Sequence, residues 1–136
     1  KHALWENTTR TPLIISAPKS IEKNRLCESP VSFIDIYPTL IELCGLPERE
    51  ELDGKSFVPL LHNPDAKWDK PVLTTYGKGN HAIRTERWRY IHYFDGTDEL
   101  YDHQKDPEEW KNIADVPKYR SVIEELKNSL PKTERD

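Results

Sequence analysis

The sequence has 136 residues, 35% of them hydrophobic and 10% aromatic, which is enough apolar material for one ordinary domain with a core. Its net charge is -4 at pH 7 and its acidic and basic residues are interleaved, which excludes the basic surface typical of proteins that bind nucleic acid or anionic membranes. No apolar run approaches the roughly 20 residues of a membrane-spanning helix, so we expect neither nucleic acid nor a membrane as a partner.

The chain begins with Lys1 and contains no Met, and its first residues lack the charged, apolar and small-residue regions of a secretory signal. We therefore expect it to be a piece of a longer polypeptide. The first apolar run, Leu13 to Ile15, lies between two prolines, and this pattern predicts a buried strand over residues 12–17. No partner strand is evident further along the chain, so the strand would present an unpaired edge if the chain stood alone.

The next element is an amphipathic helix, predicted over residues 32–44. Its apolar residues follow the helical spacing i, i+3, i+4, i+7, i+8 and i+11, and Gly45 stands at the C-terminal cap. Pro38 interrupts the pattern, so either the helix kinks there or Asp35 caps a second segment whose first turn holds the proline. Residues 56–61 predict a short helical turn, and the proline-containing stretch 62–71 predicts a domain boundary near residue 70.

Beyond residue 70 the hydrophobic period changes from helical to alternating. Four short segments rich in β-branched and aromatic residues, separated by turn residues, predict an antiparallel meander over 72–76, 81–85, 88–94 and 99–102. Asp106, Pro107 and Glu109 have the pattern of a capped short helix around Trp110. The last element is a helix over 118–130 whose apolar stripe is expected to cover the sheet. The stripe consists of Tyr119, Val122, Ile123, Leu126 and Leu130.

Residue patterns alone assemble no complete active site. The sequence has no nucleophile elbow, no glycine-rich phosphate loop and no metal-binding pair such as HExxH, and its five histidines are scattered. Cys27 and Cys44 have no CxxC or histidine partner at ligand spacing, so they predict no metal site and are expected to be structural thiols, Cys44 on the apolar face of its helix. From this alone the chain is a soluble α+β piece.

Five segments, in their order and spacing, carry a resemblance to a known family. They are KHALWENTTRTPLIISAP, SPVSFIDIYPTLIELCGLP, LDGKSFVPLL, HAIRTERWRYIHYFDGTDELYD and DPEEWKNIA. Together they resemble the C-terminal part of type I, formylglycine-dependent sulfatases, and within that family they are most similar to bacterial iduronate-2-sulfatase-like enzymes. The resemblance extends from Lys1 to about Leu130.

This resemblance implies an α+β fold class, the C-terminal part of an alkaline-phosphatase-like sulfatase. Residues 1–70 would finish the large α/β domain, with the strand 12–17 and the helix 32–44, and residues 71–136 would form a four-stranded antiparallel sheet with the terminal helix 118–130. The formylglycine, made from Cys or Ser in a C/S-x-P-x-R motif, and the calcium ion are expected upstream of residue 1. The partners implied are this upstream α/β domain and a sulfated carbohydrate, with self-association as a further possibility for the isolated piece. Localisation cannot be read from the sequence, and the resemblance implies a periplasmic or secreted parent.

Site residues also follow from the resemblance, position by position. Lys1 aligns with a lysine that contacts the substrate sulfate, so it is the catalytic candidate. His81 and Asn80 lie in a glycine-flanked stretch that faces the substrate cleft in relatives, and His2 adjoins Lys1, so these three are candidates for substrate binding. Arg10 and Arg84 match family arginines that we expect to form structural ion pairs. No metal ligand is expected within this chain.

We therefore interpret the sequence as part of a sulfatase that hydrolyses sulfate esters of a sulfated sugar or glycosaminoglycan, inactive in isolation. Two alternatives stay open. One is a phosphate or phosphonate ester hydrolase of the same superfamily, which would have a Thr or Ser nucleophile and two metals upstream. The other is a non-catalytic α+β binding module, against which the unpaired apolar strand argues.

Overall fold

The structure is a computed structural model that describes residues 3–17 and 20–132. The chain divides into two compact units, one containing residues up to Pro12 together with those from Pro71 onward, the other containing Leu13–Lys70. The division next to Lys70 lies beside the predicted boundary, but the first twelve residues group with the sheet. That residues 1–70 finish a large α/β domain stays a prediction.

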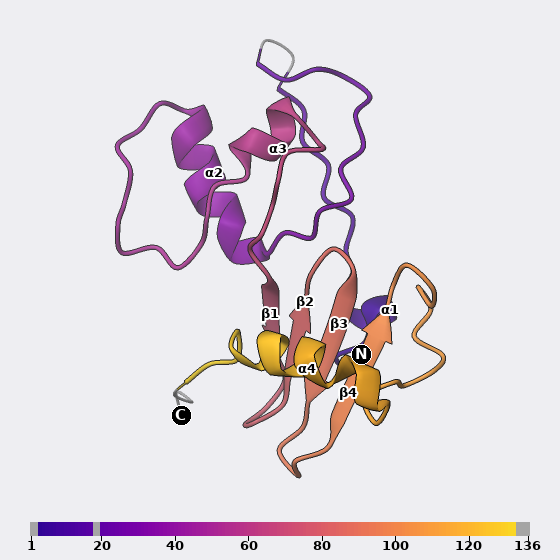
Figure 1. Ribbon diagram of the computed structural model, residues 1–136. Helices are drawn as coiled ribbons and strands as arrows, with labels where there is room; N and C mark the ends of the chain where they lie inside the picture. The colour runs from indigo at the N-terminus through magenta and orange to yellow at the C-terminus, as the bar shows by residue number, and fades with distance from the viewer. Residues whose placement is uncertain (1–2, 18–19, 133–136) are drawn as a thin grey trace. The chain divides into compact units, whose positions relative to one another are not determined.

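A four-stranded antiparallel sheet forms the centre of the first unit (Figure 1). The strands β1 (Val72–Thr75), β2 (His81–Arg84), β3 (Trp88–His92) and β4 (Asp98–Asp102) pair in sequence order, which confirms the predicted meander. Its connections are tight because glycines occupy the left-handed region: Gly77 and Gly79 between β1 and β2 have φ of 67° and 72°.

The C-terminal helix packs on one face of this sheet (Figure 1). The 3-10 turn η2 (Pro117–Tyr119) leads into α4 (Arg120–Lys127), so the predicted helix over 118–130 forms with its first turn tightened and its last residues outside it. The predicted stripe is confirmed, because Ile123 and Leu126 pack against the sheet residues Ile83, Tyr90 and Leu100. The fold class is therefore α+β, as expected.

The other face of the sheet is covered by the N-terminal segment, residues 3–9, which includes the short helix α1 (Glu6–Thr9) (Figure 1). Leu4 is buried there against Ala82, Ile91 and Tyr101, which lie on the face opposite the α4 core because side chains alternate along each strand. The sequence analysis did not predict α1, since a four-residue helix has no periodic signal. This segment joins the beginning of the chain to a sheet that starts about 70 residues later.

The second unit is organised around the buried carboxylate of Asp35. The 3-10 turn η1 (Phe33–Asp35) precedes α2 (Ile36–Leu43), and Pro38 lies in the first turn of α2, which is the second of the two arrangements predicted for this proline. The Asp35 side chain makes no cap bond to α2; it accepts from the backbone N–H groups of Ser32 and Lys55 at 2.9 and 2.8 Å and pairs with Lys70 Nζ at 2.5 Å. These contacts hold the connection to α3 (Val58–His62) against α2.

Three local predictions are wrong. Residues 11–17 form no strand, and Ile14 is 90% exposed, because all four strands of the described residues pair with one another and leave this segment without a partner. Residues 106–110 form a turn instead of a short helix, because Glu109 adopts a left-handed φ of 59° that a helix cannot contain. Cys44 is exposed at the end of α2, not covered by apolar neighbours, and Cys27 is exposed too; both thiols are free.

Within the described residues, no helix combines the length and the apolar character needed to cross a membrane.

Apolar side chains of the second unit give a testable prediction. Phe33, Tyr37 and Leu40 follow one another at helical spacing along η1 and α2 and are all exposed. We expect the isolated chain to bind a hydrophobic dye or to self-associate, and the double change Phe33→Ser with Leu40→Ser to reduce both. Dye fluorescence and light scattering measure this. Trp110→Ser is the control, since Trp110 is exposed but lies in the other unit; an equal reduction by this variant would contradict the prediction.

Candidate functional site

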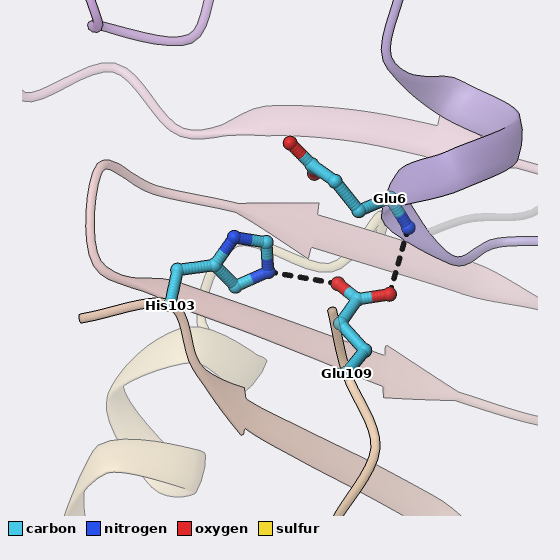
Figure 2. A group of neighbouring side chains, drawn as sticks. All are labelled: Glu6, His103 and Glu109. Atoms are coloured by element: carbon cyan, nitrogen blue, oxygen red, sulfur yellow. Dashed lines mark hydrogen bonds and ion pairs between the residues drawn. The ribbon is translucent and has the colours of Figure 1, made fainter. Parts of the chain in front are cut away.

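The strongest concentration of interacting ionisable side chains in the first unit lies between the N-terminal segment and the sheet. We call it the charged cluster. It consists of Glu6 from α1, Arg84 from β2, Arg89 from β3, His103 after β4, and Glu109 from the following loop. Figure 2 shows three of its members converging, with the Glu109 carboxylate between His103 and the backbone of Glu6.

Arg89 is the centre of the charged cluster. Its side chain is 3% exposed, and strand alternation directs it to the face that the N-terminal segment covers. One terminal nitrogen pairs with the Glu6 carboxylate, and the other donates to the backbone carbonyl of Leu4 at 2.8 Å. Nε lies 2.6 Å from Glu109 Oε1, but its N–H is not aligned for a hydrogen bond, so that contact is an ion pair only.

Glu109 and His103 complete the charged cluster in a defined protonation pattern. Glu109 Oε2 accepts from the backbone N–H of Glu6 at 2.7 Å, and its Oε1 lies 2.8 Å from His103 Nε2. The other ring nitrogen of His103 lies 2.9 Å from Arg84 Nη2, which can only donate. Nδ1 must therefore accept, so the neutral ring carries its proton on Nε2 and donates it to Glu109.

The charges of the cluster balance. The two carboxylates of Glu6 and Glu109 face the two guanidinium groups of Arg84 and Arg89, so these four charges sum to zero. Burial by itself would raise the pKa of Glu6, but the hydrogen bond from Arg89 and the charge and hydrogen bond of Arg84 outweigh it and hold that pKa below its ordinary value. Glu6 is therefore ionised at neutral pH.

Glu6, His103 and Glu109 also satisfy the spacing of a metal site, because one ligand atom from each lies within 4.8 Å of the others. Their chemistry does not fit a resident cation. Arg84 and Arg89 already contact the same carboxylate oxygen of Glu6, and a divalent ion would add two positive charges to a neutral, largely buried group. We therefore interpret the charged cluster as a structural ion network.

The site residues predicted from the sequence lie elsewhere or beyond the described part. Lys1 and His2 lie outside the described residues. His81 is the first residue of β2, buried, with Nδ1 2.9 Å from Thr75 Oγ1. Asn80 accepts from the backbone N–H of Phe94 at 3.2 Å and donates to the carbonyl of Lys78, so it links the β1–β2 and β3–β4 turns. Roles in catalysis and substrate binding stay predictions for all four.

Sequence reasoning found one member of the charged cluster. Arg84 was expected to form an ion pair, and it does so with Glu6. Arg10, expected to do the same, is exposed and pairs with no carboxylate among the described residues. The other four members, Glu6, Arg89, His103 and Glu109, were missed. The one available signal was the charged Arg89 within a strand whose neighbours are aromatic and aliphatic, which predicts a buried partner without naming it.

Comparison with known proteins shows which family the sequence matches. Residues 1–136 match the family model described as N-sulphoglucosamine sulphohydrolase, C-terminal. A sulfatase of Formosa agariphila is 45% identical over 98% of this chain and 26% of its own length. A protein solved in complex with its substrate D-glucosamine-2-N,6-O-disulfate superposes with a TM-score of 0.71 at 30% identity, over 89% of this chain and 27% of that one.

A phosphonate monoester hydrolase of Agrobacterium radiobacter superposes with a TM-score of 0.52 at 29% identity, over 70% of this chain and 23% of its own. The chain thus spans about a quarter of the length of the relatives it matches. None of these three proteins is described as an iduronate-2-sulfatase, so the narrower resemblance to that enzyme is not confirmed.

The lowered pKa of Glu6 gives a prediction about stability. Because its pKa is lower in the folded chain than in the unfolded one, ionised Glu6 adds stability that is fully present above the unfolded pKa of about 4.5 and lost as the pH falls through the folded pKa. Glu6→Gln should lower the free energy of unfolding at pH 7 by about 2 kcal/mol, less than for a fully buried pair because Glu6 is partly exposed. On acidification the free energy of unfolding should fall less for the Glu6→Gln variant than for the wild type.

Urea unfolding at a series of pH values between about 7 and about 3 measures both effects. Glu22→Gln is the matched control, since it removes an exposed ion pair with Arg25 in the second unit. The prediction is wrong if Glu6→Gln and the wild type lose stability equally on acidification.

Proposed function

The chain belongs to the sulfatase family, as the C-terminal region of N-sulphoglucosamine sulphohydrolase type, and from this we propose that it completes an enzyme that hydrolyses sulfate esters of a sulfated sugar or glycosaminoglycan. The observation that carries the proposal is the match over all 136 residues, together with 45% identity to a sulfatase over 98% of the chain. The substrate class is supported by the sulfated glucosamine bound to the protein that superposes best of those described above.

The proposed enzyme divides its chemistry between this chain and the rest of a longer polypeptide. A formylglycine would supply the nucleophile and a calcium ion would hold the sulfate, and we assign both to residues outside this chain. The sequence contains no C/S-x-P-x-R motif, and the donor set of the charged cluster does not fit a cation. For a parent of this kind we also propose a periplasmic or secreted location.

Lys1 is the residue of this chain that we propose for the reaction, on its position in the family resemblance. Cleavage of a sulfate ester increases negative charge on the sulfuryl oxygens and on the leaving oxygen. An ammonium held within hydrogen-bond distance stabilises that charge more in the transition state than in the substrate, an effect of about 3 kcal/mol for one preorganised donor. We propose on the same family resemblance that the sugar is contacted by His81, Asn80 and His2.

A phosphate or phosphonate ester hydrolase is the second candidate, because a phosphonate monoester hydrolase shares the fold at 29% identity. Sulfate and phosphonate esters are both tetrahedral anions, and a fixed lysine serves either reaction. The nucleophile and the number of metals distinguish the two enzymes, and both lie outside this chain. A binding module without catalysis is the weakest candidate, since the relatives described above are enzymes.

The sequence that precedes Lys1 in the gene decides between the candidates. We expect it to contain a C/S-x-P-x-R motif, and to end in a segment resembling Asp-His-Gly and Leu-Gly-Glu-His-Gly with a Trp two residues before Lys1. Reading that sequence and testing its Cys or Ser for conversion to formylglycine by mass spectrometry measures this. A Thr or Ser nucleophile with carboxylate and histidine ligands for two metals would instead identify the phosphonate hydrolase.

In the complete enzyme, Lys1→Ala should lower turnover about a hundredfold or more and leave the melting temperature little changed, because an ammonium that contacts the substrate sulfate contributes to catalysis and not to a core. His92→Ala should do the reverse. Its Nδ1 contacts Asp98 Oδ1 at 2.8 Å on the sheet, so its loss should cost about 1 kcal/mol of stability and little turnover. Steady-state kinetics and thermal melts measure both variants, and the isolated 136-residue chain should hydrolyse no sulfate ester. A fully active Lys1→Ala enzyme would refute the role of Lys1.

A further inference from the structure

The N-terminal segment is attached to the sheet by contacts that fix its backbone, not only its side chains. The carbonyl of Leu4 accepts from Arg89 Nη1 at 2.8 Å, and the N–H of Glu6 donates to Glu109 Oε2 at 2.7 Å. Trp5 Nε1, between them, donates to Glu99 Oε2 at 2.7 Å. Three consecutive residues are therefore held from β3, β4 and the loop that follows.

These contacts are more specific than stability requires. Apolar residues of similar volume would cover the sheet at least as favourably, because burying charges costs desolvation energy that their pairing only partly returns. Unlike apolar packing, an ion network fixes both the position and the direction of the peptide groups that it binds. Arg89 contributes most of this, since its planar guanidinium holds a carbonyl, Glu6 and Glu109 at the same time.

The position fixed in this way is close to Lys1 along the chain. Leu4 is three positions after Lys1, and a stretch of that length extends at most about 11 Å. The Glu6 carboxylate adds hydrogen bonds from Arg84 and Arg89, whereas Thr8 and Thr9 bond only within the segment. Release of the peptide groups of Leu4 and Glu6 would therefore leave Leu4 held by apolar packing alone and would loosen the chain on the C-terminal side of Lys1. Displacing a catalytic group by about 1 Å can cost about a hundredfold in rate.

We propose that Arg89 and Glu109 are positioning residues for the active-site lysine, which they place by holding the peptide groups of Leu4 and Glu6 on the sheet. This rests on the proposed function, in which Lys1 contacts the sulfate. Arg89 and Glu109 touch no reacting atom in this scheme. They determine how precisely the ammonium of Lys1 is presented, and they do so through the backbone.

The test compares variants of the complete enzyme with 4-nitrophenyl sulfate as substrate, a sulfate ester that requires no sugar recognition. Arg89→Met keeps an unbranched chain and removes the guanidinium, and Glu109→Gln keeps the shape of Glu109 without its charge. Arg87→Met is the matched control, because the Arg87 guanidinium pairs with Asp102 and not with residues 3–9. Each variant is measured for kcat, for KM, and for amide hydrogen exchange of residues 4–9 by mass spectrometry.

We expect Arg89→Met and Glu109→Gln to accelerate exchange in residues 4–9 and to lower kcat about tenfold or more with KM changed much less, and Arg87→Met to do neither. The decisive measurement is a double-mutant cycle. If Arg89 acts through Lys1, adding Lys1→Ala to Arg89→Met should lower kcat by far less than the product of the two single effects. If Arg89→Met does not fold, Glu109→Gln takes its place in the cycle.

Two results overturn the proposal. One is faster exchange in residues 4–9 with kcat unchanged, and the other is a fully multiplicative loss in the double variant, since either would mean that the charged cluster is structural only. Failure of the proposed function gives a different pattern, in which Lys1→Ala by itself keeps full activity or the wild type does not cleave the sulfate ester. The two failures are therefore distinguishable in the same set of measurements.

Discussion

A buried guanidinium must be paired, and in this chain that requirement is met by residues that are far apart in sequence. Arg89 lies under the N-terminal segment with almost no exposure, so its charge and its donors have to be matched by Glu6, Glu109 and the carbonyl of Leu4. The beginning of the chain and the loop after β4 are thereby held on one face of the sheet. In the second unit the buried charge is negative. The carboxylate of Asp35 is matched there by two backbone N–H groups and by Lys70.

The parts of the fold that were predictable are those whose signals are local. Turn residues and alternating β-branched and aromatic segments predicted the sheet, and helical spacing predicted the stripe of α4, because each pattern reports which side of an element faces a core. The predicted strand at Leu13 to Ile15 was wrong because a strand also needs a partner, which no local pattern can supply. The predicted helix around Trp110 was wrong because Glu109 has a left-handed backbone conformation, in which its side chain binds the N–H of Glu6. A local capping pattern does not reveal such a distant contact.

The candidate site was the least predictable part. Members of the charged cluster lie up to 103 residues apart, and nothing in the neighbourhood of Glu6 or Glu109 indicates that the two will meet. Function was accessible by another route, because the order of five segments preserves a family resemblance even where single residues carry no signal. The resemblance identifies which residues to suspect, such as Lys1 and His81, and the geometry shows what surrounds the described ones. His81 and Asn80 are tied into the turns of the sheet, so any contact they make with a ligand would have a rigid base.

The long separation between Glu6 and its partners also has a consequence for synthesis of the protein on the ribosome. The N-terminal segment is made before the sheet, and Glu109 follows Glu6 by 103 residues, an interval of about 5 to 20 s at ordinary rates of translation. Until β2, β3 and β4 have been made, Leu4 has no complete sheet to cover it, while each β-hairpin needs only a short stretch of chain to close. The segment should therefore dock after the sheet has formed, although it emerges from the ribosome before the sheet does. A nascent chain stalled before Glu109 would expose the segment to chaperones and proteases that the finished chain excludes.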